Sequence, residues 1–224
     1  MVIRFYKKMH EIINLKNVSL ILEKKQIYNL NLRITNGDFF LINGKNATGK
    51  STLLKLFCLK ILPTRGNFYL NGKNIGLKDK KLILEYRKKI GVILQNDYLI
   101  PFFSVYENIE LASEIQNYKS DFNLRINQIL DWLDLKEIEN TKVDKLSKGE
   151  KQKVVIARAL INKPNIIIAD QPENFLDKST VKKVFFLFES LNKQGTTIII
   201  TSNLEKIITV NYKTINLDQS ERWL

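Results

Sequence analysis

Residues Gly44–Ser51 read G-K-N-A-T-G-K-S, a complete G-x-x-x-x-G-K-[ST] loop. The loop follows the apolar run at 39–42 and precedes a segment, 52–59, with the apolar spacing of an amphipathic helix. A glycine loop between a buried strand and a helix N-terminus directs backbone N–H groups and the helix dipole at one point, where phosphates can bind. The sequence therefore predicts a nucleoside triphosphate site.

The residues of this loop have expected roles toward the phosphates. Lys50 is expected to reach the β- and γ-phosphates, and the Ser51 hydroxyl is expected to ligate Mg²⁺. A chance match is the alternative, and the strand before the loop and the helix after it argue against chance. The predicted nucleotide-binding residues are Gly44, Lys45, Asn46, Ala47, Thr48, Gly49, Lys50, Ser51 and Thr52.

Asp170 ends the apolar run I-I-I-A-D, so we expect it at the carboxyl end of a buried strand beside the strand that feeds the loop. There its carboxylate can hold Mg²⁺ through water. A plain N-cap for the next helix is the alternative, and the upstream loop favours the metal. Gln95, which follows the apolar run at 90–94, is a neutral oxygen donor for the same ion, although alone it would be read as a surface residue.

Ser147, Lys148, Gly149 and Glu150 precede a helical pattern at 151–160. Serine and glycine before a helix make a second candidate phosphate-binding N-terminus. The alternative is a capping box, in which Ser147 is the N-cap and Glu150 is at N3. Local physics does not separate the two interpretations.

The elements that must position these residues alternate between strands and helices. Apolar alternation and turn residues predict strands at 11–18, 26–34, 38–43, 67–70, 90–94, 166–169 and 196–201, and helical segments within 105–135 and at 151–160. Asn36-Gly37 is expected to form a hairpin-type turn, and 90–94 is expected inside a sheet, not at its edge. The pattern predicts an α/β fold with a mostly parallel sheet and helices on both faces.

The composition restricts the class of protein. At 224 residues, with 44% hydrophobic and 26% charged residues, the chain suits one globular core. No apolar run approaches the roughly 18 residues that span a bilayer, and the start does not read as a secretory signal. The single cysteine, Cys58, is expected on an inward helix face in a reducing compartment.

The net charge of +13 fits three interpretations. The lysines can simply solvate the surface, or they can be attracted to an anionic membrane face. Nucleic acid is the least favoured partner because the lysines are dispersed and are not interleaved with aromatic residues.

The order of the motifs resembles the ATP-binding cassette (ABC) superfamily over essentially the whole chain. The matching elements are the loop at 44–52 (Walker A), Gln95 (Q-loop), L-S-K-G-E at 146–150 (signature), I-I-I-A-D at 166–170 (Walker B) and F-L-D at 175–177 (D-loop). Finer phrasing, such as S-V-Y-E-N-I at 104–109, is similar to the FtsE family of cell-division cassettes. Lipoprotein-releasing and macrolide-export cassettes share much of it.

The resemblance implies one ATP-binding domain over 1–224, with a P-loop NTPase (RecA-like) core at about 1–95 and 153–224, an antiparallel N-terminal β-part and a helical subdomain at about 96–152. It implies ATP and Mg²⁺ as cofactors and ATP hydrolysis as the family's reaction. It also implies a homodimer or cassette heterodimer, in which the signature and the D-loop residue Asp177 act across the interface. The implied partner is an integral membrane subunit (an FtsX-like permease), which places the chain peripherally on the cytoplasmic face of the inner membrane, with no nucleic acid.

Two positions depart from the family's catalytic pattern. Gln171 follows Asp170 where the family has a glutamate that polarises the attacking water, and an amide cannot accept the proton of that water. Losing a general base costs about 10²–10⁴-fold in rate. Ser202 replaces the histidine that contacts the γ-phosphate, and the only histidine is His10. We therefore expect ATP binding with slow or absent hydrolysis.

Other departures concern the signature and the adenine. Lys148 stands where the family has glycine, and it adds bulk and charge beside the partner's γ-phosphate; Glu150 is a tolerable variant. The aromatic residue that stacks on adenine maps to Leu22, with Tyr28 as an alternative out of register.

The segment 98–103, Y-L-I-P-F-F, is either core or the docking site of a membrane subunit's coupling helix.

Sustained pumping by a transporter or lipoprotein extractor is the first rival function, and Gln171 and Ser202 argue against it. A non-transport cassette acting on DNA or ribosomes is the second rival, and a pseudoenzyme paired with an intact cassette is the third.

Overall fold

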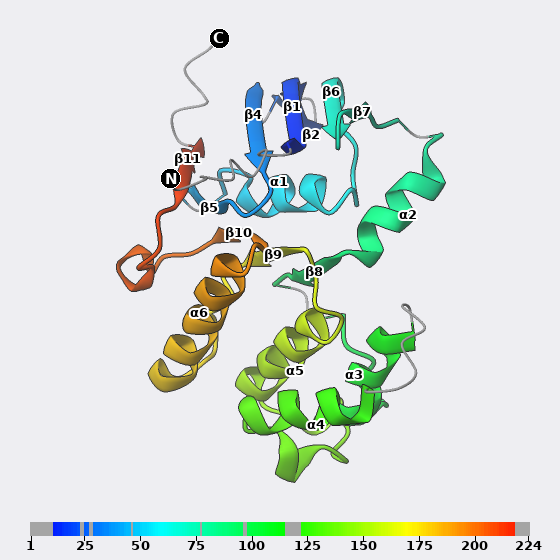
Figure 1. Cartoon of the computed structure of the whole chain (residues 1–224), viewed down its shortest axis with the longest axis vertical. Coiled ribbons are helices and arrows are strands. Elements are labelled where there is room, and N and C mark those ends of the chain that lie inside the picture. The colour runs from blue at the N-terminus through cyan, green and yellow to red at the C-terminus, as the bar shows by residue number, and fades with distance from the viewer. Residues whose placement is uncertain are drawn as a thin grey trace, which may run out of the picture.

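The computed structural model describes residues 11–22, 25–26, 29–45, 47–76, 78–95, 98–114 and 122–217. Within them an antiparallel sheet lies above a five-stranded parallel sheet, and most of the helices lie below the parallel sheet (Figure 1). This arrangement confirms the predicted α/β class with its antiparallel N-terminal part. Asn46, Tyr28 and His10 lie outside the described residues, as does the side chain of Leu22.

The antiparallel sheet is built around β1 (Glu11–Ser19), which pairs with β4 on one side and β6 on the other. The other strands of this sheet are β4 (Leu30–Thr35), β6 (Arg65–Leu70) and β7 (Lys73–Asn74). A separate two-stranded sheet pairs β2 (Ile21–Leu22) with β3 (Lys25–Gln26). Ile13, Leu15 and Val18 are buried. The apolar residues of the alternating pattern predicted for this strand therefore face the core.

The parallel sheet has the order β11–β5–β10–β9–β8. Its strands are β11 (Lys213–Asn216), β5 (Phe39–Asn43), β10 (Thr197–Thr201), β9 (Ile166–Asp170) and β8 (Ile90–Ile93), and each neighbouring pair is parallel. In the register, Thr201 pairs with Ile42 on one side and with Asp170 on the other. All the strand ends that carry predicted site residues therefore meet at one edge.

Each face of this sheet packs into its own core. Phe40 and Ile42 join α1 (Lys50–Phe57) and the antiparallel sheet, whereas Phe39 and Leu41 join the helices on the opposite face. Those helices are α5 (Lys148–Leu160) and α6 (Lys178–Lys193). Because both faces are covered, the central strands are apolar at nearly every position.

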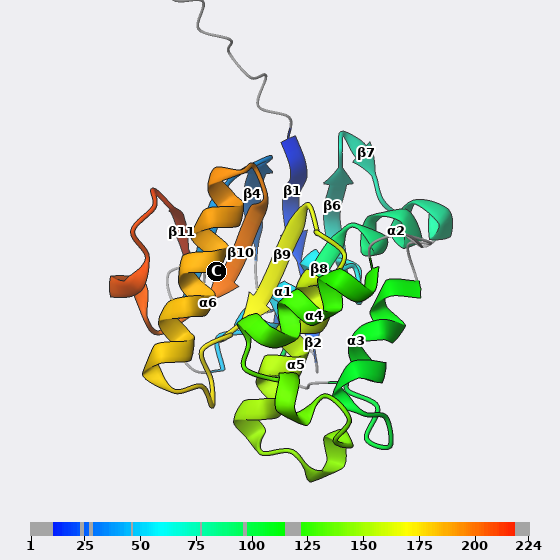
Figure 2. The same cartoon turned by 60° about the horizontal axis from the view of Figure 1, so that its bottom comes forward.

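The helical part lies at the lower end of the molecule, with α3 and α4 beside α5 (Figure 2). The remaining helices are α2 (Lys80–Lys88), α3 (Val105–Glu114), α4 (Phe122–Trp132), η1 (Lys136–Ile138), η2 (Val143–Lys145) and η3 (Glu205–Ile207). Ile126, Leu130 and Leu133 form the buried face of α4 and its end, as their spacing predicts. α5 runs unbroken across position 152, and the proposed subdomain boundary there stays a prediction.

Three local expectations were wrong. Asn36-Gly37 does not close a hairpin, because it passes from β4 to β5 in the other sheet. β8 is parallel but lies at the edge of the sheet, where helix α5 packs against it. Asp170 does not lie beside the strand that feeds the loop, because β10 separates β9 from β5. Cys58 is buried as expected, and burial raises the pKa of its thiol to about 12.

Asp177 fixes the start of α6. One of its carboxylate oxygens accepts from the Ser179 and Thr180 backbone N–H groups at 2.9 and 3.0 Å, and the other accepts from the Thr180 hydroxyl at 2.5 Å. The hydroxyls and N–H groups of Ser179 and Thr180 hold the pKa of this carboxyl well below its usual range. The carboxylate therefore stabilises the fold in its ionised form.

Asp177→Ala is expected to lower the thermal midpoint by several degrees at neutral pH, because the helix loses its N-cap. The folded pKa is depressed, so the loss should be constant above about pH 5 and should shrink as the pH falls below about 4. Thermal melts from pH 7 to pH 3 measure it. In the matched control, Asp177→Asn keeps a capping oxygen, and its own melting point should vary less with pH than that of the wild type. A difference between Asp177→Ala and wild type that is independent of pH would contradict this account.

Candidate nucleotide site at the carboxyl edge of the sheet

The loop after β5 has the backbone of a phosphate cradle. Gly49 caps α1 with φ of 90°, and Ala47 has φ of 64°, so both lie in the left-handed region. Left-handed residues in a loop turn successive N–H groups toward one side, which makes an anion-binding concavity. Glycine suits the cap because it has no Cβ to strain there.

Lys50 folds back over this loop. Its ammonium group donates to the carbonyl oxygen of Gly44 and, at 2.7 Å, to that of Lys45. The Thr48 hydroxyl donates to the same Lys45 carbonyl at 2.9 Å. A cation is therefore already held at the loop, and its positive charge suits a phosphate there.

Asp170 is 3% exposed and has a fixed orientation, because the Thr201 hydroxyl donates to its Oδ1 at 2.6 Å. Ser51 lies in the first turn of α1, which packs against β9, and Gln95 follows β8 at the same edge. Hydroxyl, carboxylate and amide oxygens are a donor set that fits Mg²⁺. Among the described residues, no group of three or more His, Cys, Asp or Glu side chains is arranged so that it could hold a metal ion by itself. Mg²⁺ usually keeps several waters and binds substrate phosphates, so these side chains would share the ion with phosphates and water.

Gln171 is held at this edge by both its backbone and its side chain. Its N–H donates to the carbonyl and the hydroxyl oxygen of Thr201, each at 3.0 Å, and its φ is 47°. Its Oε1 accepts from Asn174 Nδ2 at 3.0 Å and from Gln95 Nε2 at 3.3 Å. The fold thus brings Gln95 and Gln171 together although 76 positions separate them.

Ser202 does not stand alone, because it is paired with a carboxylate that sequence reasoning missed. Its hydroxyl donates to Glu173 Oε1 at 2.8 Å and accepts from the Leu204 N–H at 3.0 Å. A cavity of about 430 Å³ adjoins it, lined by Ile42, Asn43, Gly44, Lys50, Ser202, Asn203, Leu204, Lys206 and Ile207. The sequence signal that could have pointed to this pairing is the presence of an acidic residue, Glu173, in the turn after Asp170.

The signature segment forms the capping box left open by the sequence. The Ser147 hydroxyl accepts from the Glu150 N–H at 3.2 Å, and the Glu150 carboxylate accepts from the Ser147 N–H at 2.8 Å. The Ser147 hydroxyl and N–H keep the pKa of Glu150 below its ordinary value. Lys148 lies with its ammonium 5.3 Å from the Phe175 ring centroid. A Cβ on Gly149 would meet the Phe175 carbonyl oxygen at 2.8 Å, so glycine permits this close approach.

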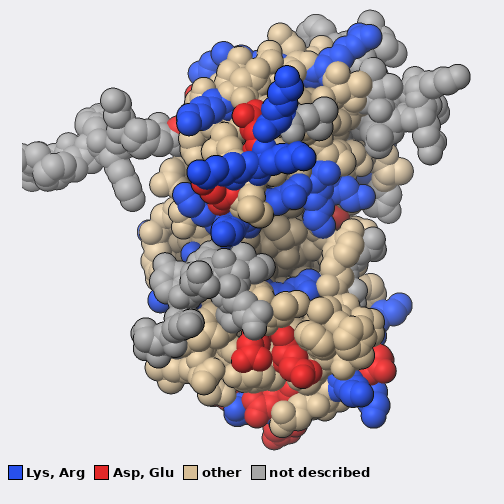
Figure 3. Space-filling view, turned by 90° about the vertical axis from the view of Figure 1, so that its right-hand side faces the viewer, with Lys and Arg blue, Asp and Glu red and all other residues tan. Residues whose placement is uncertain are grey.

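A second cavity, of about 650 Å³, opens between the parallel sheet and the helical part. Figure 3 shows a hollow on this side, with Lys and Arg gathered above it and Asp and Glu below it. Its lining residues are Cys58, Lys60, Arg87, Lys88, Ile90, Val92, Leu94, Tyr98, Leu111, Ala112, Val155, Arg158, Ala159 and Asn162. The floor is therefore apolar and the rim is basic.

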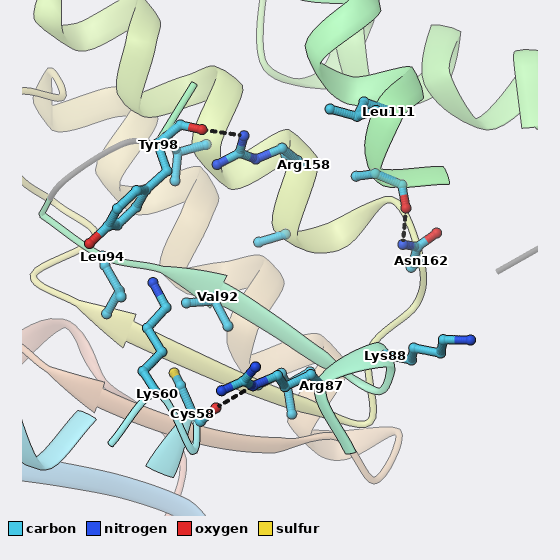
Figure 4. A pocket seen from close by; sticks show the side chains of 14 residues that line it. Cys58, Lys60, Arg87, Lys88, Val92, Leu94, Tyr98, Leu111, Arg158 and Asn162 are labelled. Carbon is cyan, nitrogen blue, oxygen red and sulfur yellow. Dashed lines mark hydrogen bonds between the residues drawn. The ribbon is translucent and has the colours of Figure 1, made fainter. Parts of the chain in front are cut away.

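Part of the segment 98–103 borders this cavity. Tyr98 is 56% exposed, and the Lys60 ammonium lies 4.1 Å from its ring centroid. Arg158 donates a hydrogen bond to the Tyr98 backbone carbonyl at 2.9 Å (Figure 4). Phe102 is 68% exposed and makes an edge contact with Phe103, whereas Leu99 is buried. The segment is thus neither all core nor all surface.

The loop at the head of α1 and the buried Asp170 on a parallel sheet define a P-loop NTPase. A family model described as "ABC transporter" matches residues 27–174. The chain therefore belongs to the ABC transporter family of ATP-binding domains. Such domains bind ATP, normally with Mg²⁺, and work as dimers with membrane subunits on the cytoplasmic side. In this chain, no helix of the described part is long and apolar enough to cross a membrane.

Several named relatives are similar to the chain. The cell division ATP-binding protein FtsE of Bacillus subtilis is 33% identical over 85% of this chain and 84% of its own length. The lipoprotein-releasing protein LolD of Aquifex aeolicus is 32% identical over 93% of this chain and 95% of its own. A dimeric ATP-binding cassette in a post-hydrolysis state, bound to ADP and phosphate, has a TM-score of 0.82 at 31% identity, covering 92% of this chain and 94% of that chain.

Lys50→Ala is expected to weaken ATP binding by roughly 10- to 100-fold, because the phosphates lose a charge-assisted hydrogen bond. Titration calorimetry with Mg·ATP measures the change. Lys55→Ala, which removes an exposed lysine from the last turn of the same helix, is the matched control and should bind as the wild type does. Equal losses in the two variants would show that net charge, not the loop, determines the affinity.

Proposed function

We propose that this chain is the ATP-binding subunit of an FtsEX-like membrane complex, in which ATP and Mg²⁺ drive dimer closure and hydrolysis is slow. The observation that carries the slow turnover is the environment of Gln171. Its side-chain oxygen accepts from Asn174 and Gln95, and an amide at this place offers no base for a water proton. Binding rests on different groups, namely the Gly44–Thr52 loop, Asp170 and Ser51.

The roles of the remaining site residues belong to the same proposal. Ser147, Lys148, Gly149 and Glu150 would close over the triphosphate of the partner subunit, with Asp177 at the interface. Gln95 would complete the environment of Mg²⁺ and its water. Ser202 would lie toward the γ-phosphate, and its capacity to donate there is limited by Glu173. A neutral Gln171, which offers no base for the water proton, favours a long-lived closed dimer over rapid cycling.

Continuous transport is the second candidate function. LolD of Bacteroides fragilis, at 35% identity over 84% of this chain, and MetN of Francisella tularensis, at 38% over 78% of this chain and 51% of its own length, carry release and import in their names. A macrolide export protein, MacB of Bdellovibrio bacteriovorus, is 34% identical. Pumping requires repeated hydrolysis, so the turnover number separates this function from a signalling cassette.

Gln171→Glu is expected to raise residual ATP hydrolysis roughly tenfold or more, because it supplies a general base. The N–H groups that Asn174 and Gln95 now direct at Gln171 would hold a carboxylate equally well. Phosphate release by purified protein measures the rate, and the Gln171→Glu, Lys50→Ala double variant gives the background. An unchanged rate would mean that Gln171 is not at the water site, and a wild-type rate typical of an active cassette would contradict impaired turnover.

The 650 Å³ cavity is the proposed docking place of the integral membrane subunit, an FtsX-like permease. Tyr98 supplies an exposed aromatic beside an apolar floor of Val92, Leu94 and Leu111. Lys60 and Arg87 lie at the rim, where they would attract acidic side chains. The occupant is thus proposed to be an amphipathic segment with acidic residues, carried on the cytoplasmic side of that subunit.

Replacing Tyr98 and Phe102 together by alanine is expected to lower recovery of the membrane subunit at least about tenfold, because exposed aromatic anchors carry much of an interface's energy. Affinity purification from native membranes, with the co-purifying integral protein identified and quantified, measures it. Phe186→Ala removes a side chain that is 71% exposed on α6 and is the matched control. Equal recovery with both variants would place the docking surface elsewhere.

A further inference from the structure

Glu173 and Ser202 join the loop after β9 to the loop after β10. Glu173 Oε1 accepts from the Ser202 hydroxyl at 2.8 Å and from the Asn203 backbone N–H at 3.0 Å. A serine hydroxyl has one proton, so Ser202 cannot donate at the same time to a phosphate oxygen. Its own oxygen already accepts from the Leu204 N–H at 3.0 Å. The pairing with Glu173 therefore determines whether the Ser202 hydroxyl is available to donate a hydrogen bond to a phosphate.

Fold stability alone does not explain this carboxylate. Its second oxygen, Oε2, is buried and has no hydrogen-bond partner, and a buried acceptor without a donor is costly. Glu189 shows the contrast, because its two oxygens accept from the N–H and the hydroxyl of Thr209. Glu189 is a satisfied structural link, whereas Glu173 is only half satisfied.

The two donors that Glu173 engages belong to residues beside the phosphate loop. Ser202 and Asn203 line the 430 Å³ cavity together with Gly44 and Lys50. A hydroxyl and a backbone N–H that converge on one anionic oxygen are also the donors that a phosphate oxygen would take. The carboxylate of Glu173 thus occupies a pair of donors that faces the same cavity as the loop lysine.

We infer that Glu173 is a positioning residue that holds the Ser202 hydroxyl and the Asn203 N–H in the nucleotide-free chain, as an internal substitute for an oxygen of the terminal phosphate. A nucleoside triphosphate must displace the carboxylate to gain these donors, whereas a diphosphate does not reach them. Glu173 therefore lowers the affinity for triphosphate, and it raises the binding free energy that is needed before the dimer closes. This inference rests on the proposed ATP-binding function.

The test compares Mg·AMP-PNP with Mg·ADP by titration calorimetry, at a concentration where light scattering gives one oligomeric state for all variants. Glu173→Ala removes the acceptor and is expected to tighten AMP-PNP binding about five- to tenfold, with less than a twofold change for ADP. Glu173→Gln keeps an acceptor oxygen but removes the charge, so a smaller gain is expected. Ser202→Ala added to Glu173→Ala should remove most of the gain, because the released hydroxyl is its source.

Glu189→Gln is the matched control, since it alters a carboxylate link away from this cavity, and it should leave the AMP-PNP to ADP ratio unchanged. The inference is overturned if Glu173→Ala leaves that ratio unchanged, whether or not both affinities or the melting temperature fall. It is also overturned if the variant loses residual hydrolysis at unchanged AMP-PNP affinity, which would make Glu173 a catalytic group. If the wild type binds neither nucleotide, the proposed function itself fails.

Discussion

The hydrogen bond from the Thr201 hydroxyl to Asp170, at 2.6 Å, joins the end of the central strand of the parallel sheet, β10, to the end of its neighbour β9. Thr201 also pairs in register with Ile42, the residue before the last one of the strand that feeds the phosphate loop. The carbonyl oxygen and the hydroxyl oxygen of Thr201 both accept a hydrogen bond from the Gln171 backbone N–H. One buried threonine therefore sets the relative positions of the loop, Asp170 and Gln171, the last two being the residues that we propose for the metal and water sites. The two faces of the sheet are packed into separate cores, which keeps this edge from shifting.

The polar groups of the site are already paired with one another. Lys50 donates to loop carbonyls, Ser202 donates to Glu173, and Gln95 donates to Gln171. A ligand must exchange these bonds, so its net gain per bond is much smaller than the strength of an isolated bond. Binding energy from the phosphate charges and from a second subunit must supply the remainder. We therefore expect a cassette built in this way to gain its nucleotide affinity from closure more than from a pre-formed open pocket.

The sequence predicted the local structure well at the loop before α1 and at the carboxylate that ends β9, and the capping box was one of its two interpretations of 147–150, because these features depend on short-range spacing. It failed where long-range order decides. β10 lies far along the chain yet inserts between β5 and β9, so the expected adjacency of Asp170 and the loop strand was wrong. β8 is apolar enough for an interior strand, but its apolar side chains face a helix and a cavity at the edge. Glu173 was missed because its partner, Ser202, lies 29 positions away and only the fold brings the two together.

The loop that follows β9 connects all these parts. Three residues of this loop accept hydrogen bonds from other elements. The Gln171 side chain accepts from Gln95, the Pro172 carbonyl accepts from Gln152 of α5 at 3.1 Å, and the Glu173 carboxylate accepts from the Ser202 hydroxyl. Farther along, the Phe175 ring lies beneath the Lys148 ammonium, and Asp177 caps α6. Lys148 therefore contacts the same loop that carries Gln171, the residue that we propose for the water site. Phe175 has φ of 65° and is 63% exposed, so this end of the loop is backbone-strained and uncovered. A subunit that packs against it would act at once on the signature, on Glu173 and on Gln171, because one short segment holds all three.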